Sequence, residues 1–381
     1  MKAIVYTTYG PPDVLQIKEV ETPTPKDDEV LIRIHAAAVT TTDCSLHKGD
    51  KLMRLVFGLR RPRRPILGTE FAGEIEATGK DVRLLREGDQ VFAATGAGFG
   101  AHTEYICLPE DGALARKPAN ATYEEAAAIC EGGLTALPFL RDKGKIQRGH
   151  NVLINGASGA VGTSAVQLAK SFGANVTGVC GPTNVELVKS LGADTVIDYT
   201  RADFTQTGQT YDIIFDAVGK SSFSRCKGSL KPGGVYLATV PSLALYAHVL
   251  WTSKIGDKKA KVAATGMRPA RQQAQDLLVL KELTEAGTLR PVIAGCYPSD
   301  QIAEAHRRVE TGTRRDMSSS CWHSSTRPDN ALRSAVGNRG RYSCFRVATG
   351  LGRPDVFRQP PPHRDLGSVS QRPPPTRSTR G

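Results

Sequence analysis

Short apolar runs separated by turn residues fill the first 121 positions of this 381-residue chain. Runs rich in Val, Ile, Phe and Tyr are typical of strands, because branched and aromatic side chains suit a pleated sheet while glycine and proline end it. The predicted strands cover residues 3–6, 30–35, 71–77, 90–94 and 103–108. We therefore expect a β-rich N-terminal region.

Strands and helices alternate from residue 122 onward. Thr122 and Glu125 form a capping-box pattern, which predicts the start of a helix. Predicted strands at 151–155, 175–180, 195–198, 212–217, 235–239 and 260–264 then alternate with predicted helices at 163–171, 184–191 and 221–230. This order predicts an α/β fold with a doubly wound parallel sheet.

A glycine-rich turn follows the strand predicted at 151–155. Gly156, Gly159 and Gly162 stand at three-residue spacing before a helix. Such a turn lets a pyrophosphate approach backbone N–H groups at the positive end of the helix, and it lets the helix pack closely on the strand. Ordinary turns also use glycine, but the strand before this turn and the helix and strand after it favour a nucleotide site.

The residues after the second strand bear on the choice of dinucleotide. NAD-binding proteins usually have Asp or Glu about twenty residues past the glycines, to bind the ribose hydroxyls. This chain has Cys180, Gly181, Pro182, Thr183 and Asn184 instead. Since no carboxylate is there to repel a 2′-phosphate, we expect NADP(H). Because no Arg or Lys is there either, NAD(H) stays open as the alternative.

The net charge of +12 is concentrated at the C-terminal end. From residue 313 onward there are 13 Arg, 4 Asp and no Lys or Glu, so the rest of the chain is nearly balanced at +3. This balance gives no reason to expect nucleic acid as a partner. Low apolar content and unbalanced charge predict that residues 313–381 are disordered, and the abrupt change in composition suggests a shifted reading frame.

Cysteine usage and hydropathy indicate the compartment. The eight cysteines form no CxxC pair, which is typical of free thiols in a reducing cytosol. The N-terminus lacks the apolar core of a secretory signal, and the apolar run at 237–251 is too short to span a membrane. We therefore expect a cytoplasmic protein with no membrane partner. A basic segment at 54–64 is either a lid that attracts phosphates or, as we favour, a solvated loop.

Several longer motifs occur in a fixed order along residues 1–312. They include ILGTEFAGEIEATGKDV, GGLTAL, NGASGAVGTSAVQLAKSFGA, LVKSLGADTVIDY and LKPGGVYL. Together they resemble the zinc-free quinone oxidoreductase branch of the medium-chain dehydrogenase/reductase superfamily. The resemblance implies a Rossmann doubly wound parallel sheet inserted in a GroES-like β-rich catalytic domain, with the dinucleotide bound between the two.

The resemblance also implies cofactor-binding residues, in three groups. Thr135 in GGLTAL and the pair Thr239 and Val240 match segments near the nicotinamide. The pyrophosphate turn corresponds to Gly159, Ala160, Val161 and Gly162, with Gly156 at its start. The adenosine end corresponds to Thr183, Asn184 and Tyr199.

The expected chemistry depends on whether zinc can bind. Zinc-dependent relatives have Cys and His where this chain has Thr40 and Thr69, and threonine hydroxyls are poor zinc ligands. Without a Lewis acid, the resemblance implies hydride transfer to a quinone or an activated enone, with Thr40 and Asp43 lining the site. A polar turn at residues 40–43 is an equally weighted alternative. The other activities left open are a broad alcohol or aldehyde dehydrogenase and a non-catalytic NADPH-binding regulator.

The family order divides the chain into four segments. We expect a catalytic domain at 1–121, a Rossmann domain at 122–268, a return to the catalytic domain at 269–312 and a disordered or frame-shifted tail at 313–381. The return segment is predicted to contain helices at 269–285 and 299–309 and a strand at 291–294. Because the tail lacks the apolar closing strand of the family, we expect an unpaired sheet edge. A small-molecule substrate is the expected partner, with a homodimer left open.

Overall fold

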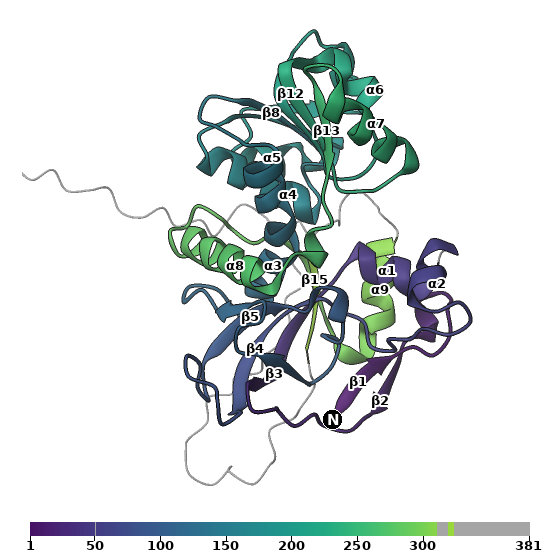
Figure 1. Cartoon of the computed structure of the whole chain (residues 1–381), viewed down its shortest axis with the longest axis vertical. Coiled ribbons are helices and arrows are strands. Elements are labelled where there is room, and N and C mark those ends of the chain that lie inside the picture. Colours follow the sequence, from purple (N-terminus) through teal and green to yellow (C-terminus); the bar gives the residue numbers. More distant parts are fainter. Residues whose placement is uncertain (50, 311–318, 324–381) are drawn as a thin grey trace, which may run out of the picture. The chain divides into compact units, whose positions relative to one another are not determined.

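The structure is a computed structural model that describes residues 1–49, 51–310 and 319–323. Two large sheets organise this part of the chain, one parallel with six strands and one largely antiparallel with seven (Figure 1). A separate antiparallel pair joins β1 (Lys2–Val5) to β2 (Gln16–Glu19). The fold class expected from the sequence is confirmed, because the six parallel strands lie between the parts of the antiparallel sheet in chain order.

The parallel sheet has the strand order β10-β9-β8-β11-β12-β13. Its strands are β8 (Asn151–Asn155), β9 (Asn175–Cys180), β10 (Thr195–Asp198), β11 (Tyr211–Asp216), β12 (Leu230–Ala238) and β13 (Lys259–Val262). Val152, Leu153 and Ile154 of β8 are fully buried, as expected for an apolar strand covered on both faces. The strand order reverses at β8, and ligands of such sheets bind beside this reversal, at the carboxyl ends of the strands.

Helices connect the parallel strands. They are α4 (Ala160–Ser171) after β8, α5 (Val185–Ser190) after β9, α6 (Phe223–Cys226) after β11 and α7 (Leu243–Lys254) after β12. The helix predicted at 221–230 is wrong in length, because α6 is short and continues as a 3₁₀ turn into β12. The helix α7 was not predicted, since apolar residues occur all around it and leave no periodic pattern.

The antiparallel sheet contains four of the five predicted N-terminal strands, because the strand predicted at 3–6 is β1 and belongs to the separate pair with β2. Its members are β3 (Glu29–Val39), β4 (Glu70–Thr78), β5 (Gln90–Ala94), β6 (Tyr105–Pro109), β7 (Leu114–Arg116), β14 (Ile293–Pro298) and β15 (Ser319–His323). The strands β2 and β7 were missed, because the first is exposed and has a single apolar residue, Ile17, and the second is only three residues long. The return helices are confirmed as α8 (Ala270–Glu285) and α9 (Ile302–Glu310).

A long helix, α3 (Tyr123–Pro138), connects the apolar cores of the two sheets. It begins as predicted, with Thr122 Oγ1 accepting from Glu125 N at 3.2 Å and Glu125 Oε2 accepting from Thr122 N at 2.8 Å. Buried α3 residues such as Ala127 belong to one apolar cluster together with Phe92 of β5 and Ile154 of β8. The packing therefore couples the glycine turn after β8 to the β-rich sheet.

Two helices occupy segments that the sequence suggested were loops. The helix α1 (Thr41–Lys48) replaces the turn considered for residues 40–43, and α2 (Lys51–Phe57) covers the start of the basic segment at 54–64. The solvated-loop interpretation is wrong for that part of the segment. Both helices are short, so neither has the repeated apolar spacing by which longer helices are recognised.

The strand β15 lies inside the tail that we expected to be disordered. It pairs in parallel with β14 and antiparallel with β3, so the expected unpaired edge at this position is wrong. The five residues SSCWH supply the backbone partners although they lack the apolar sequence of the family's closing strand. The other tail residues, 313–318 and 324–381, lie outside the described residues, and the four-segment division stays a proposal.

Across the described ranges, no helix combines the length and the apolar character needed to cross a membrane.

Candidate functional site

An open pocket lies beside the turn between β8 and α4. One wall is formed by the turn itself and the start of α4, the segments predicted to bind a pyrophosphate. The lining residues are Val39, Thr41, Glu131, Gly156, Gly159, Ala160, Val161, Gly162, Ala217, Val218 and Val309. The structure therefore brings all five predicted pyrophosphate-turn residues to one pocket.

Close packing explains two of the glycines. Gly156 has a φ of +82°, and a Cβ there would lie 2.3 Å from Val218 Cγ1. A Cβ at Gly162 would lie 2.0 Å from the Gly156 carbonyl oxygen, far inside van der Waals contact. Any larger residue at Gly162 would push the first turn of α4 away from the end of β8.

The start of α4 presents main-chain N–H groups to the pocket. Gly159 is the N-cap, with extended backbone and no capping side chain, and Ala160 and Val161 are the first helical residues. The first N–H groups of a helix have no partner within it, and they lie at the positive end of the helix dipole. With no side chain of the N-cap competing for these donors, this turn fits a diphosphate.

The residues predicted for the adenosine end lie at the ends of the paired strands β9 and β10. Thr183 is exposed, while Asn184 is buried and donates from Nδ2 to Ser158 Oγ at 3.2 Å. Tyr199, 37% exposed, stands over Gly181, where an added Cβ would lie 3.1 Å from the phenol oxygen. These residues do not line the glycine-turn pocket, but they border the neighbouring strand end.

The residues predicted near the nicotinamide lie at the ends of β12 and α3. Thr239 donates its N–H to the Asp216 carbonyl at 3.1 Å, and Val240 is half exposed beside Gly219. Thr135 of α3 has its hydroxyl 3.4 Å from that of Thr265. None of the three predicted residues lines the pocket described above.

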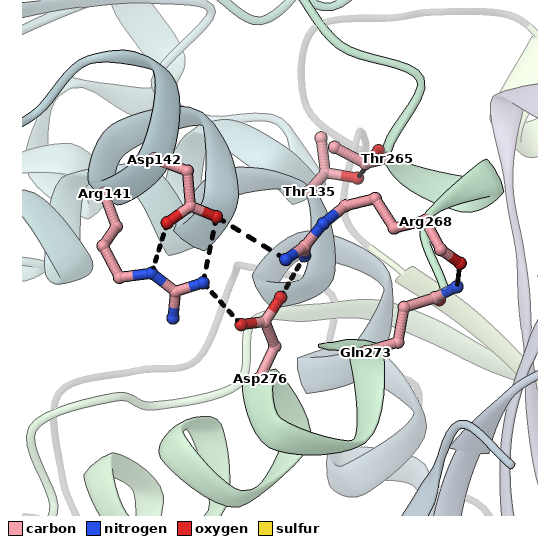
Figure 2. Close-up of polar contacts among 7 residues, drawn as sticks. All are labelled: Thr135, Arg141, Asp142, Thr265, Arg268, Gln273 and Asp276. Carbon is pink, nitrogen blue, oxygen red and sulfur yellow. Dashed lines mark hydrogen bonds and ion pairs between the residues drawn. The ribbon is translucent and has the colours of Figure 1, made fainter. Parts of the chain in front are cut away.

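Figure 2 shows an ion-pair network beside Thr135. Asp276 of α8, which is 1% exposed, accepts from Arg141 at 2.8 Å and also from Arg268. Arg141 donates to Asp142 at 2.7 Å, and this hydrogen bond holds the pKa of Asp142 below its usual value. The network joins the segment after α3 to the segment after β13, where the chain leaves the parallel sheet. It therefore holds these two segments together next to Thr135.

The predicted catalytic pair forms a helix cap. Thr40 Oγ1 accepts from Asp43 N at 3.2 Å and donates to Asp43 Oδ2 at 2.8 Å, while Asp43 Oδ1 accepts from Gly68 N at 2.9 Å. Both side chains are buried, and neither residue lines the pocket. Thr41, which follows Thr40 at the start of α1, does line the pocket. The catalytic role of Thr40 and Asp43 stays a prediction, and the structure gives both a positioning role.

Sequence reasoning missed several pocket residues. Glu131 comes from α3, and Val218 follows β11. Val39 ends β3, and Val309 comes from α9, near the end of the described part of the catalytic region. Each lies far along the chain from the glycine turn, so no local pattern points to it.

The residues at the family's zinc positions do not fit a zinc ion. Thr40 Oγ1 donates to Asp43, and Thr69 Oγ1 donates to the Glu70 carboxylate, so both hydroxyls are engaged. Hydroxyls are poor zinc ligands in comparison with thiolate and imidazole. Burial raises the pKa of Glu70 to about 7, although the Thr69 hydrogen bond opposes the shift.

Comparisons with known proteins identify the family. Residues 26–119 match the family model for the alcohol dehydrogenase GroES-like domain, and residues 191–315 match that for zinc-binding dehydrogenase. The chain is 31% identical over 350 residues to NAD(P)H oxidoreductase RTN4IP1, mitochondrial, of Mus musculus, which covers 82% of this chain and 87% of the relative. The chain belongs to the medium-chain dehydrogenase/reductase superfamily.

Two further matches assign this dehydrogenase/reductase to a branch. It is 32% identical over 324 residues to 2-methylene-furan-3-one reductase of Solanum lycopersicum, with 82% of this chain and 76% of the relative covered. It is similar to the solved quinone oxidoreductase from Coxiella burnetii, with a TM-score of 0.75, 27% identity and coverage of 85% and 99%. The protein is therefore an NAD(P)H-dependent oxidoreductase of the quinone oxidoreductase-like branch. Since one relative is named as mitochondrial, the cytoplasmic location stays a prediction.

We expect Gly162→Ala to weaken NADPH binding at least tenfold and to lower the free energy of unfolding by about 1–3 kcal/mol, as overpacking does. The added Cβ would overlap the Gly156 carbonyl and displace the N–H groups of α4. Fluorescence titration and urea unfolding measure the two effects. The control is Gly228→Ala, because a Cβ there meets no atom within 4 Å. Equal NADPH affinity in the two variants would contradict the account of the turn.

Proposed function

We propose that this oxidoreductase transfers a hydride from NADPH to a quinone or an activated enone, without zinc. The observation that carries the proposal is the bare main-chain turn at the start of α4 facing an open pocket. The N–H groups of Ala160 and Val161 would hold the pyrophosphate, and bound NADPH would supply the hydride. The relatives named quinone oxidoreductase and 2-methylene-furan-3-one reductase support this class of acceptor, since the second name describes a ketone conjugated to a methylene group.

The remaining wall of the pocket suits an electron-poor acceptor. Val39 and Val309 contribute apolar surface, and Thr41 contributes a hydroxyl at the start of α1. A hydroxyl placed here can donate to the acceptor oxygen on which negative charge develops during hydride transfer. The cap formed by Thr40 and Asp43 fixes the first turn of α1, and thereby the position of Thr41.

A substrate screen tests this function directly. We expect the full chain to oxidise NADPH in the presence of quinones or conjugated enones, because such acceptors need no Lewis acid. The absorbance of the reduced nicotinamide gives the rate. Two further assays run in parallel, one with simple aldehydes and NADPH and one with alcohols and NADP⁺. Alcohol turnover without quinone or enone reduction would favour an alcohol dehydrogenase instead. NADPH binding with no turnover of any acceptor would favour a non-catalytic regulator.

We expect Thr41→Val to lower kcat about tenfold, because the variant keeps the side-chain shape and loses the hydroxyl. This loss is smaller than the 10²–10³ of a fully enclosed oxyanion donor, since Thr41 is exposed. Steady-state kinetics with a saturating quinone gives the value. The matched control is Thr42→Val, the neighbouring exposed threonine, which does not line the pocket. An equal kcat in both variants would show that the Thr41 hydroxyl does not contribute to the reaction.

The preference for NADPH rests on the residues beyond β9 and β10. These strands pair in parallel with Asp198 beside Cys180, so the segments that follow them leave the sheet at the same edge. Thr183 follows β9, and Arg201 follows β10, where its Nε lies 3.6 Å from Asp198 Oδ2. The Arg201 side chain is 85% exposed, so its guanidinium can pair with a 2′-phosphate next to Thr183.

We expect Arg201→Ala to lower the ratio of kcat/KM for NADPH to that for NADH by about tenfold, since only NADPH carries the 2′-phosphate. The effect should shrink at high salt, as it does for an exposed charge pair. Arg86→Ala is the matched control, because Arg86 is also 85% exposed and lies 3.8 Å from Asp89 in another part of the chain. The same ratio in wild type and Arg201→Ala would exclude Arg201 from the cofactor site.

A further inference from the structure

A buried cluster of metal-binding side chains lies between α1 and α9, which pack against each other (Figure 1). Cys44 and His47 come from α1 and His306 from α9, with exposures of 5%, 0% and 0%. The sulfur and one nitrogen from each ring all lie within 4.8 Å of one another. Sulfur and imidazole nitrogen are atoms that transition metals bind, so their grouping away from solvent needs an explanation.

The protonation of His47 is fixed by its surroundings. Its Nδ1 lies 2.9 Å from the Gly10 carbonyl oxygen, which can only accept, so Nδ1 carries the hydrogen. A neutral His47 therefore has a lone pair on Nε2. That atom lies 3.0 Å from Glu310 Oε1, the end of a carboxylate. Two acceptors facing each other at this distance repel, unless a proton or another cation lies between them.

The other atoms of the cluster are poorly satisfied, and the Cys44 thiol has only a weak contact with the His306 carbonyl oxygen, at 3.7 Å. Among the described residues, His47 Nε2, His306 Nε2 and Glu310 Oε1 are buried and have no aligned hydrogen-bond partner. His306 Nδ1 lies 3.8 Å from Cys44 Sγ, a weak contact at best. The second oxygen of Glu310 lies 3.4 Å from Lys48 Nζ, so that residue neutralises only part of the carboxylate. Buried polar atoms without partners cost free energy, which a bound cation would recover.

We propose that Cys44, His47 and His306 together bind one divalent transition-metal ion, with zinc as the ion that the donors favour, and that Glu310, whose Oε1 lies 3.0 Å from His47 Nε2, is the fourth ligand. Thiolate, imidazole and carboxylate are all ligand types that zinc takes, and four such ligands would complete its tetrahedral coordination. The hydrogen bond from His47 Nδ1 to a backbone carbonyl is also the usual second contact of a metal-bound histidine.

This site differs from the family's zinc positions. Those correspond to Thr40 and Thr69, whose hydroxyls bond to carboxylates, whereas the cluster uses the opposite end of α1 and a helix 262 residues further along the chain. A metal here would tie the N-terminal part of the catalytic region to its return segment. Because Val309 on α9 lines the pocket, the tie would also steady one wall of the site.

Cobalt substitution tests the proposal with a spectroscopic signal that does not depend on activity. The full chain, purified with chelator and titrated with Co²⁺, is expected to bind one equivalent tightly. Its spectrum should show a thiolate-to-cobalt charge-transfer band and the intense visible bands of four-coordinate cobalt. Added Zn²⁺ should displace the cobalt and erase both features.

Variants identify the ligands. Cys44→Ser is expected to remove the charge-transfer band and to weaken Co²⁺ binding by at least about 100-fold. The loss of a direct ligand should cost at least as much as the largest losses, about 100-fold, that follow when a residue supporting a ligand is changed. Cys226→Ser, a change of a buried cysteine that lies beside Ser221, should leave the spectrum unchanged. Should Cys44→Ser fail to fold, Glu310→Gln serves instead, because Glu310 is at the partly exposed end of α9. It should keep the sulfur band and bind at least tenfold more weakly.

Two results would overturn the proposal. One is the absence of stoichiometric Co²⁺ or Zn²⁺ binding by the full chain, which would leave a shared proton between His47 and Glu310 as the explanation of their contact. The other is an unchanged sulfur band in Cys44→Ser, which would locate the bound metal elsewhere. Neither result bears on the hydride transfer proposed above, because that reaction needs no metal.

Discussion

The contact between the start of α4 and the end of β8 is the constraint on which the site depends. The helix approaches so closely that the Gly156 carbonyl occupies the space of a side chain at Gly162. This approach aims the free N–H groups of Ala160 and Val161 at the reversal point of the parallel sheet, where the pocket opens. The anion-binding role that we propose for this turn depends on backbone geometry, without any basic side chain in the turn.

Packing around that contact brings distant segments to the same pocket. The helix α3 shares an apolar cluster with both sheets, so Glu131 reaches the glycine turn from one side. The helices α1 and α9 bring Thr41 and Val309 from the other side. The cluster of Cys44, His47 and His306 lies between these two helices. A metal bound there would hold α1 and α9 together, and with them the part of the pocket wall formed by Thr41 and Val309.

The parts of this account that the sequence could predict are those set by local interactions. Gly156, Gly159 and Gly162 stand within a few residues of the strand and helix that they join, so spacing and context were enough to find them.

The cap formed by Thr40 and Asp43 was recognised only as a polar turn, because the short helix after it has no clear periodicity. The pairing of Cys44 with His306 depends on tertiary packing alone. The strand β15 was missed because backbone pairing with β3 and β14 does not require an apolar sequence.

A crystal structure of the full chain with NADPH tests the central claim most directly. The account predicts pyrophosphate oxygens within about 2.7–3.2 Å of the main-chain nitrogens of Ala160 and Val161, with the nicotinamide directed toward Thr41. A dinucleotide bound elsewhere, or a pyrophosphate held by side chains while those nitrogens contact only water, would contradict it.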